Sequence, residues 1–324
     1  MNRQTIIVSI AVVTAALSFF LLNDWGTVEP NAEHALPENK VKQSSKATVQ
    51  KTTPISGTPV RKPSFDYGFK TVAEEEVPAS LRKVFGLDGC ENDYQRIQAV
   101  STLGKSLSIN ERNAVYSLLR NEENGENMLV VKNNLLNKLR NQNSMPPELT
   151  SAMISMAGDK NLNDIVRAYV IQHLRPQYRD VSDADQRRAI VDTFTAAIGE
   201  TDKEVAGNAL LAMENLSQDF KEISREDVAQ VALDMADDDS VKLHNRIAAV
   251  AVCGDTGNAD ALDTVKDLAL SDQQTVLKLS AIGTLGKIGG EDDLEQLEQL
   301  LVQEPKLFQQ AAQAAIKNIK SRIN

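Results

Sequence analysis

Seven short segments between residues 96 and 318 share one arrangement of apolar residues. In each segment an anchor residue and the residue four places later are apolar, and the residue after the anchor is apolar except for Gln313. Positions i, i+1 and i+4 lie on one face of an α-helix, so each segment is expected to form an amphipathic helix that buries this face. The segments are 96–105, 132–141, 167–176, 206–215, 246–255, 278–287 and 309–318.

The spacing of the segments predicts a repeat of two helices. Successive anchors are 36, 35, 39, 40, 32 and 31 residues apart, which leaves room for a second helix between them. The anchors are Ala99, Leu135, Val170, Ala209, Ala249, Ala281 and Ala312, and the residues four places later are Leu103, Leu139, Leu174, Met213, Cys253, Leu285 and Ile316. Second helical stretches are expected at 111–120, 146–157, 183–198, 225–236, 259–270 and 293–302.

Helix pairs that stack side by side form an α-solenoid, in which each repeat contacts only its neighbours. We therefore predict an all-α fold over residues 66–324, an α-solenoid of about seven helix pairs. The anchors and the residues four places later should be buried, and no strand is expected between residues 90 and 320.

Two consecutive stretches carry a resemblance to a known family. RIAAVAVCGDTGNADALDTVKDLAL (246–270) and KLSAIGTLGKIGGEDDLEQLEQLLV (278–302) resemble bacterial HEAT repeats, in which a basic residue begins R/K-x-x-A-[VIL]-x-x-L-G-x-[IL]-G and a second helix follows. The resemblance is strong for 239–303, good for 90–105 and 159–175 and weak elsewhere, and it loosely covers about 70–324. It implies a protein-interaction scaffold, with contacts made by the non-core residues of segments 96–105, 132–141, 167–176, 246–255 and 278–287.

The resemblance also implies a ladder of polar pairs along the repeats. In the family, an acidic or polar residue often stands six places before the basic one. That spacing is kept by Asp272/Lys278, Ser240/Arg246, Asn161/Arg167 and Glu126/Lys132, and it is not kept by Cys90/Arg96 and Glu200/Ala206. We therefore expect an interrupted ladder.

An uncharged apolar run extends from Thr5 to Leu22 after a single basic residue, Arg3. At ~1.5 Å rise per residue its length is roughly 27 Å, close to that of a bilayer core. We predict a signal-anchor transmembrane helix at 5–22, with residues 1–4 in the cytoplasm and the rest of the chain outside. A cleaved signal peptide is one alternative, although no Ala-x-Ala site follows the run, and a buried helix is another.

Residues 23–65 read as a disordered linker. From residue 27 onward this segment holds five of the chain's ten prolines, many Ser, Thr and Lys, and almost no large apolar residue. Such a composition cannot offset its own ordering entropy. Six basic residues and no acidic one lie between Lys40 and Lys62, which suits attraction to anionic lipid or cell-wall polymer, or simply solubility.

The charge of the predicted solenoid excludes one class of ligand. Residues 66–324 hold 28 basic and 41 acidic residues, a net charge of −13. Such a body repels phosphate backbones, so nucleic acid is not expected as a partner. A protein or peptide with basic segments is expected instead, unless the charge serves only solubility.

No pattern of reactive side chains indicates catalysis. His34, His173 and His244 are isolated in sequence, and Cys90 and Cys253 match no metal or redox spacing. The acidic clusters at 234–240 and 289–295 lack the frame of a calcium loop. We therefore predict no catalytic, cofactor-binding or metal-binding residue, no cofactor, no small-molecule substrate and no enzymatic activity, and binding residues are not identified.

The leading prediction of function is a membrane-tethered, extracytoplasmic HEAT-repeat scaffold that mediates protein–protein interaction. It would cross the membrane once, with its C-terminal domain facing the periplasm in a Gram-negative cell, or it would be periplasmic or secreted if the N-terminal segment is cleaved. HEAT-like repeats also occur in phycobiliprotein lyases, so a lyase-type enzyme or chaperone is one alternative. A secreted soluble solenoid that binds a cell-envelope polymer is the other.

Overall fold

The computed structural model describes residues 67–90, 92–271 and 273–323. The chain separates into two units, Met1–Thr53 and Pro54–Asn324, and all described residues belong to the second. The predicted signal anchor at 5–22 and the linker at 23–65 therefore lie outside the described residues. Among the residues that the structure describes, no helix combines the length and the apolar character that crossing a membrane requires.

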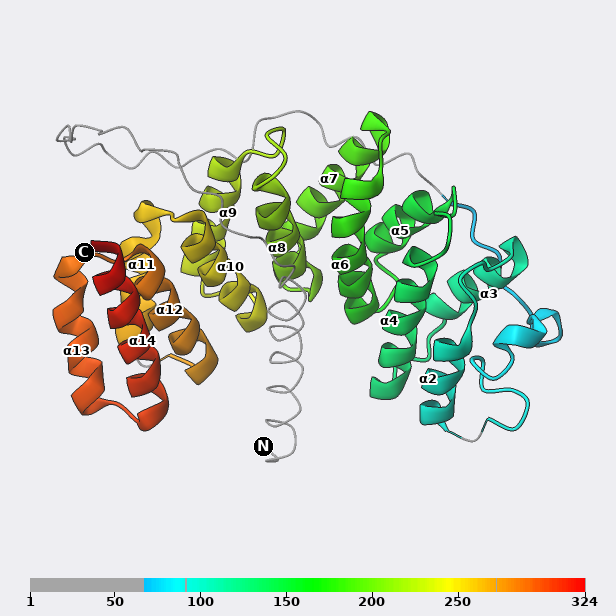
Figure 1. Cartoon of the computed structure of the whole chain (residues 1–324), viewed down its shortest axis with the longest axis horizontal. Helices are drawn as coiled ribbons and strands as arrows, with labels where there is room; N and C mark the ends of the chain where they lie inside the picture. Colours follow the sequence, from blue (N-terminus) through cyan, green and yellow to red (C-terminus); the bar gives the residue numbers. More distant parts are fainter. Residues whose placement is uncertain (1–66, 91, 272, 324) are drawn as a thin grey trace. The chain divides into compact units, whose positions relative to one another are not determined.

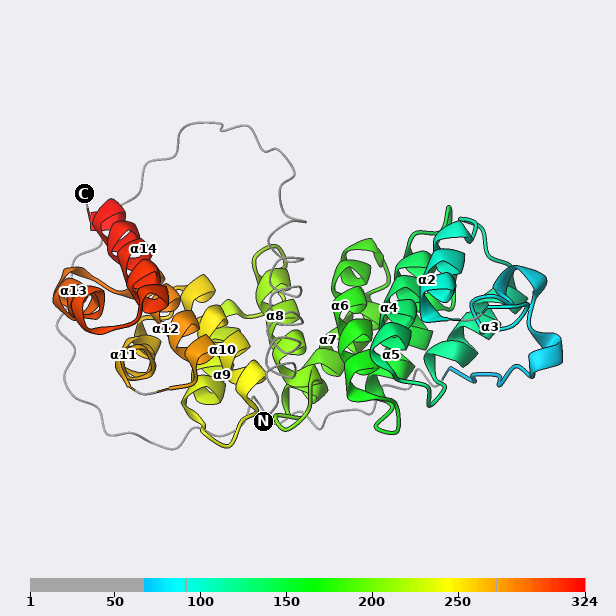
Figure 2. The same ribbon diagram turned by 90° about the horizontal axis from the view of Figure 1, so that it is seen from below.

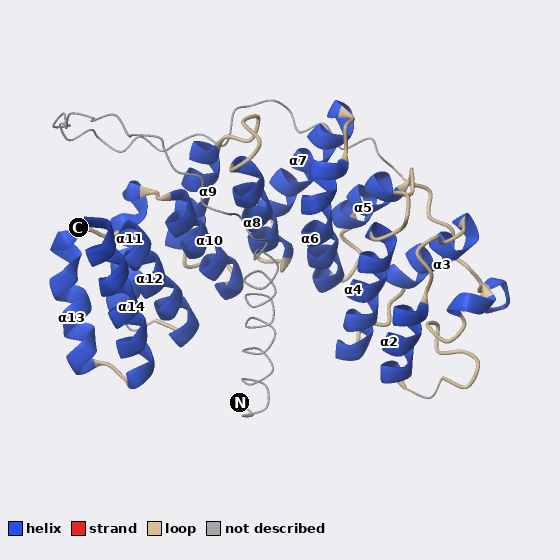
Figure 3. Ribbon diagram, in the orientation of Figure 1, coloured by secondary structure: helices blue, strands red, loops and turns tan. Residues whose placement is uncertain are grey.

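The all-α prediction is confirmed: the described residues form thirteen α-helices and no strand (Figure 3). The seven repeated segments coincide with the even-numbered helices, except that the first of these helices ends at Thr102, so that Leu103 follows it. The even-numbered helices are α2 (Asp93–Thr102), α4 (Glu126–Arg140), α6 (Asp164–Asp180), α8 (Val205–Ser217), α10 (Leu243–Thr256), α12 (Thr275–Ile288) and α14 (Lys306–Ile323). The second helical stretches are the odd-numbered helices α3 (Ile109–Leu119), α5 (Leu149–Gly158), α7 (Ala184–Ile198), α9 (Arg225–Asp237), α11 (Leu262–Leu270) and α13 (Leu294–Gln303).

The helices form two layers. Each even-numbered helix packs against the next one, from α2 to α14, so that this layer is continuous (Figures 1 and 2). Each odd-numbered helix packs on the even-numbered helix that follows it in the chain. Six odd–even pairs result, and α2 stands before them without a full helical partner. Two short 3-10 helices, η1 (Glu74–Glu76) and η2 (Ala79–Leu81), precede α2, and η2 contacts α3.

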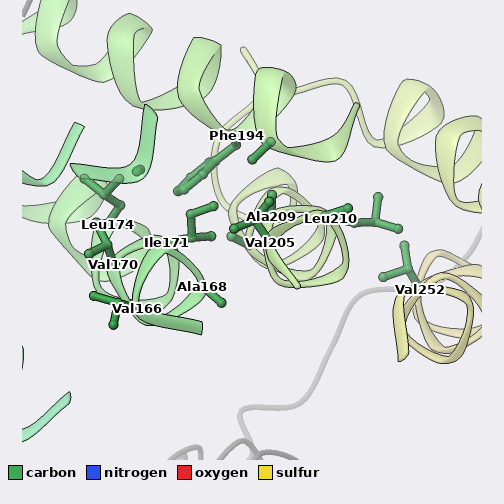
Figure 4. Packing of buried hydrophobic residues seen from close by; sticks show 14 of the residues in the cluster. Val166, Ala168, Val170, Ile171, Leu174, Phe194, Val205, Ala209, Leu210 and Val252 are labelled. Atoms are coloured by element: carbon green, nitrogen blue, oxygen red, sulfur yellow. The ribbon is translucent and has the colours of Figure 1, made fainter. Parts of the chain in front are cut away.

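The core follows the predicted periodicity with two exceptions. Twelve of the fourteen anchor and partner residues are buried, whereas Ala99 and Met213 are only half-buried. Buried side chains of α6 and α8 face one another, and the Phe194 ring of α7 points toward Ile171 on α6 (Figure 4). Close packing of this kind makes the core sensitive to changes of side-chain volume.

The two ends of the described helix stack differ in the residues that cover them. At the N-terminal end, the Tyr67 and Phe69 rings pack edge-on against the buried Tyr116 ring of α3, with centroids 5.6 and 6.1 Å from it. The Arg120 guanidinium lies 4.4 Å from the Phe69 ring centroid. At the C-terminal end, most of the exposed residues of α14 are polar or charged, although Leu307 and Ile323 are exposed as well.

Candidate binding surface

A basic side chain is buried at the start of most even-numbered helices. In each of these helices the basic residue stands three places before the anchor residue. The five basic residues are Arg96, Lys132, Arg167, Arg246 and Lys278. The Nε atoms of Arg96 and Arg167 donate to the carbonyl oxygens of Val84 and Ala157, both at 2.9 Å. The Lys132 ammonium donates to the Asn121 carbonyl at 2.8 Å, and burial lowers its pKa to about 8. These bonds attach each helix start to the segment that precedes it.

The charge partners of these residues differ from the predicted ladder. Arg167 pairs with Glu200 at 2.8 Å, and Lys278 pairs with Glu304 at 2.7 Å. Arg96 pairs with Glu123 at 2.7 Å. Each carboxylate lies in the loop before the next even-numbered helix, and Asp272, six residues before Lys278, lies outside the described residues. The ion pairs therefore connect successive repeats, and the hydrogen bond from Arg167 lowers the pKa of Glu200. Arg246 differs again, since its partner is Asp239 at 2.7 Å.

At the junction of α8 and α10 another set of contacts replaces the basic residue. Ala206 occupies the basic position, and the buried Asn245 amide donates to the carbonyl oxygens of Thr201 and Lys203 at 2.8 and 2.9 Å. Its oxygen accepts from the Gly207 N–H at 2.8 Å. An amide can satisfy both donors and acceptors, which a basic side chain cannot. The sequence predicted a broken ladder here, and Asn245 bridges the gap.

The exposed side of the even-helix layer carries a feature that the sequence analysis missed. Five residues before the anchor, Tyr94, Val130 and Ile165 are 67%, 44% and 37% exposed, on α2, α4 and α6. We call these three residues the apolar row. The same position on α8 and α10 holds Glu204 and His244, which pair at 2.9 Å. Each member of the row lies two residues before a segment that was predicted to make contacts. The signal was present in the sequence as an apolar residue at one repeat position in three successive repeats.

Two of the histidines and cysteines considered above, His173 and Cys253, are buried in the core. His173 is buried, its Nε2 lies 3.1 Å from Asn133 Oδ1, and burial lowers its pKa to about 3. Cys253 is buried in α10, where burial raises its pKa to about 12. Cys90 is half-buried, and His34 lies outside the described residues.

The two acidic clusters occupy helix boundaries. Residues 234–240 cover the end of α9 and the loop after it, and residues 289–295 surround the 3-10 helix η4 (Glu291–Asp293) and the start of α13. The buried Asp293 accepts from the Gly290 N–H at 2.8 Å and pairs with Lys266 at 2.6 Å. Among the residues that the structure describes, no group of three or more His, Cys, Asp or Glu side chains is placed to hold a metal ion.

Comparison with known proteins gives one family match. The family of HEAT repeats matches residues 243–317, which run from α10 into α14. Human deoxyhypusine hydroxylase in complex with glycerol aligns with 76% of this chain and 97% of its own, at 14% identity and a TM-score of 0.32. An engineered protein aligns with 75% of this chain and 98% of its own, at 16% identity and a TM-score of 0.24. A search of curated proteins gives no match. Residues 243–317 thus match HEAT repeats, and the described part of the chain is a HEAT-like α-solenoid.

Proposed function

We propose that the chain is a protein-binding scaffold that performs no chemistry of its own. It is tethered to a bacterial membrane by residues 5–22 and holds its solenoid outside the cytoplasm. The observation that carries the proposal is the unbroken layer of even-numbered helices from α2 to α14. Stacked repeats present a long surface on which an extended partner can lie, and HEAT repeats generally serve protein interaction.

Crosslinking in intact cells tests the scaffold proposal. The full chain, carrying an affinity tag, is crosslinked, purified and analysed by mass spectrometry. A fusion of residues 1–65 to an unrelated soluble domain serves as the control for contacts that the tether alone makes. We expect a protein partner crosslinked to even-helix residues and missing from the control. The proposal fails if no protein partner is recovered while the purified chain converts a small substrate.

Reporter fusions test the topology. Alkaline phosphatase fused after Asn324 should be active, because that enzyme needs an oxidising compartment to form its disulfides. A reporter that works only in the cytoplasm should be silent at the same place, and deletion of residues 5–22 should reverse both results. Activity of the cytoplasmic reporter on the intact chain would refute export. N-terminal sequencing adds one distinction, because a mature chain beginning near residues 25–35 would mean that the segment is cleaved.

A further inference from the structure

The apolar row is an exposed surface on three helices that lie next to one another. Tyr94, Val130 and Ile165 belong to α2, α4 and α6, and α4 packs between the other two (Figures 1 and 2). Scattered exposed apolar residues are common on proteins, but these three occupy one repeat position in three successive repeats. Because the three residues occupy equivalent positions in successive repeats, we expect their side chains to form a line across the layer.

The spacing of the row matches one peptide conformation. Packed helices stand 8–10 Å apart, so neighbouring members of the row are separated by about that distance. A polyproline II segment has three residues per turn and rises ~3.1 Å per residue, which brings every third side chain to the same face about 9 Å further on. In an extended β-strand, successive side chains point to opposite faces. Residues i and i+3 therefore lie on opposite faces, and only one of them could contact the row.

Two exposed acidic residues, Glu122 and Glu126, lie in the loop before α4 and in its first turn, and Glu126 stands one helical turn before Val130. We call these two residues the acidic border. The other acidic residues at these helix starts already have basic partners, since Asp93 and Glu123 pair with Arg96, and Asp164 pairs with Arg167 and Lys203. This border attracts Lys and Arg side chains.

We propose that the apolar row binds an extended segment of a partner protein, with a bulky apolar side chain at every third residue and Lys or Arg between them. The proposal rests on the scaffold function and specifies the chemistry of its partner. The apolar side chains lie against Tyr94, Val130 and Ile165, and the basic side chains lie over the acidic border. Apolar burial provides affinity, and the charges set the direction of approach and the partner that is chosen.

Binding of synthetic peptides to the full chain, held in mild detergent, tests the proposal. A fluorescent peptide with leucine at every third position and lysine or serine elsewhere is compared with a peptide of the same composition whose leucines are adjacent. We expect saturable binding of the first, measured by fluorescence anisotropy, and binding of the second weaker by about tenfold. Equal binding of both peptides would overturn the proposal, because charge alone would then explain it.

Substitutions locate the site. The triple variant Tyr94→Ser, Val130→Ser, Ile165→Ser should weaken binding of the first peptide by about tenfold or more. Leu307→Ser is the matched control: Leu307 occupies the same repeat position on α14 and is 51% exposed. It should leave binding unchanged. A thermal unfolding midpoint unchanged in the triple variant shows that the fold is intact, and unchanged binding by such a folded triple variant would overturn the proposal.

The charge component has its own variant. Glu122→Gln combined with Glu126→Gln should weaken binding about threefold and reduce its dependence on salt, since both side chains are exposed in the loop before and the first turn of α4. An unchanged salt dependence would contradict a role for the acidic border in binding.

Crosslinking in cells separates this inference from the scaffold function. If the triple variant recovers the same partner in the same amount, the row is not the site and the scaffold stands, whereas no partner for the unaltered chain removes both.

Discussion

Arg167 shows how a charge is accommodated between two repeats. Its side chain is 2% exposed and donates to the Ala157 carbonyl, while its two terminal nitrogens bond both oxygens of Glu200 at 2.9 and 2.8 Å. The Glu200 side chain is 16% exposed. Burying two charges is costly, and the paired geometry with a further hydrogen bond offsets that cost. Removing Arg167 leaves the half-buried Glu200 carboxylate without its main partner.

Arg167→Met should therefore lower the free energy of unfolding by about 3–5 kcal/mol, measured by urea denaturation. Methionine keeps much of the side-chain volume, so the loss reports mainly the unpaired Glu200. The control is Lys320→Met, because the Lys320–Glu298 pair is 50% and 54% exposed. Exposed pairs contribute less than about 1 kcal/mol. Similar losses in the two variants would contradict the role of burial.

His173 should make the fold sensitive to mild acid. Burial first, and then the nearby Arg140 charge, lower its pKa from 6.5 to about 3. The unfolded chain binds a proton at His173 below pH 6.5 and the folded chain does not. The contribution of this pKa difference to the free energy of unfolding is therefore complete above pH 6.5, and it is lost as the pH falls toward 3.

Between pH 6.5 and 5, where few carboxylates titrate, the free energy of unfolding should fall by up to about 1.4 kcal/mol per pH unit because of this residue. His173→Gln should remove that slope, because glutamine cannot be protonated in this range. Chemical denaturation at a series of pH values measures both chains. An equal slope in the variant would show that His173 is not the group responsible.

Helix α12 contains two glycines one turn apart with opposite surroundings. A Cβ atom on Gly286 would lie 2.7 Å from the Cα and 2.9 Å from the Cβ of Ala315, so α12 and α14 approach closely at this point. Gly283 is exposed, and a Cβ atom there would have no neighbour within 4 Å. The two positions therefore separate the effect of helix packing from that of helix propensity.

Gly286→Ala should lower the free energy of unfolding by about 1–3 kcal/mol, because the methyl group overpacks the contact with α14. Gly283→Ala should raise it by up to about 1 kcal/mol, because alanine favours the helix. Thermal unfolding of the two variants beside the unaltered chain measures the difference. A loss of stability in both variants would mean that propensity and packing had been assigned wrongly.

The stack as a whole depends on contacts between neighbours. Helix α14 packs against α12 and α13 and covers the last repeat, and among the described residues it makes no extensive contact with α2 to α10. In such an array, the loss of a terminal element should be felt most by the repeat beside it. The buried face of α14, which includes Ala312, Ala315, Ile316 and Ile319, separates the apolar side of α12 from water.

A chain that ends at Pro305 should therefore lose protection locally. Amide hydrogen exchange should become faster in α12 and α13, because the truncation uncovers their buried faces, and it should change little in α2 to α6. Mass spectrometry of deuterium uptake measures each helix separately. Faster exchange throughout the chain would show that the solenoid unfolds as one unit.

The sequence was sufficient to place all seven even-numbered helices and their buried faces, because an amphipathic helix depends on residues three and four places apart. It also indicated the six odd-numbered helices. It did not indicate η1 and η2, since short 3-10 turns have no periodic signal. Nor did it predict that Ala99 and Met213 are half-buried, because burial at the edge of a stripe depends on how closely the neighbouring helix approaches.

The partners of the buried bases and the apolar row required the folded chain. Glu200 is 33 residues from Arg167, and the two meet only because one repeat stacks on the next. Asn245 reaches the Gly207 N–H across 38 residues for the same reason. Tyr94, Val130 and Ile165 stand five residues before the anchors, which at about 100° per residue places them well away from the buried stripe. That no neighbouring helix covers them depends on helix packing and not on local spacing.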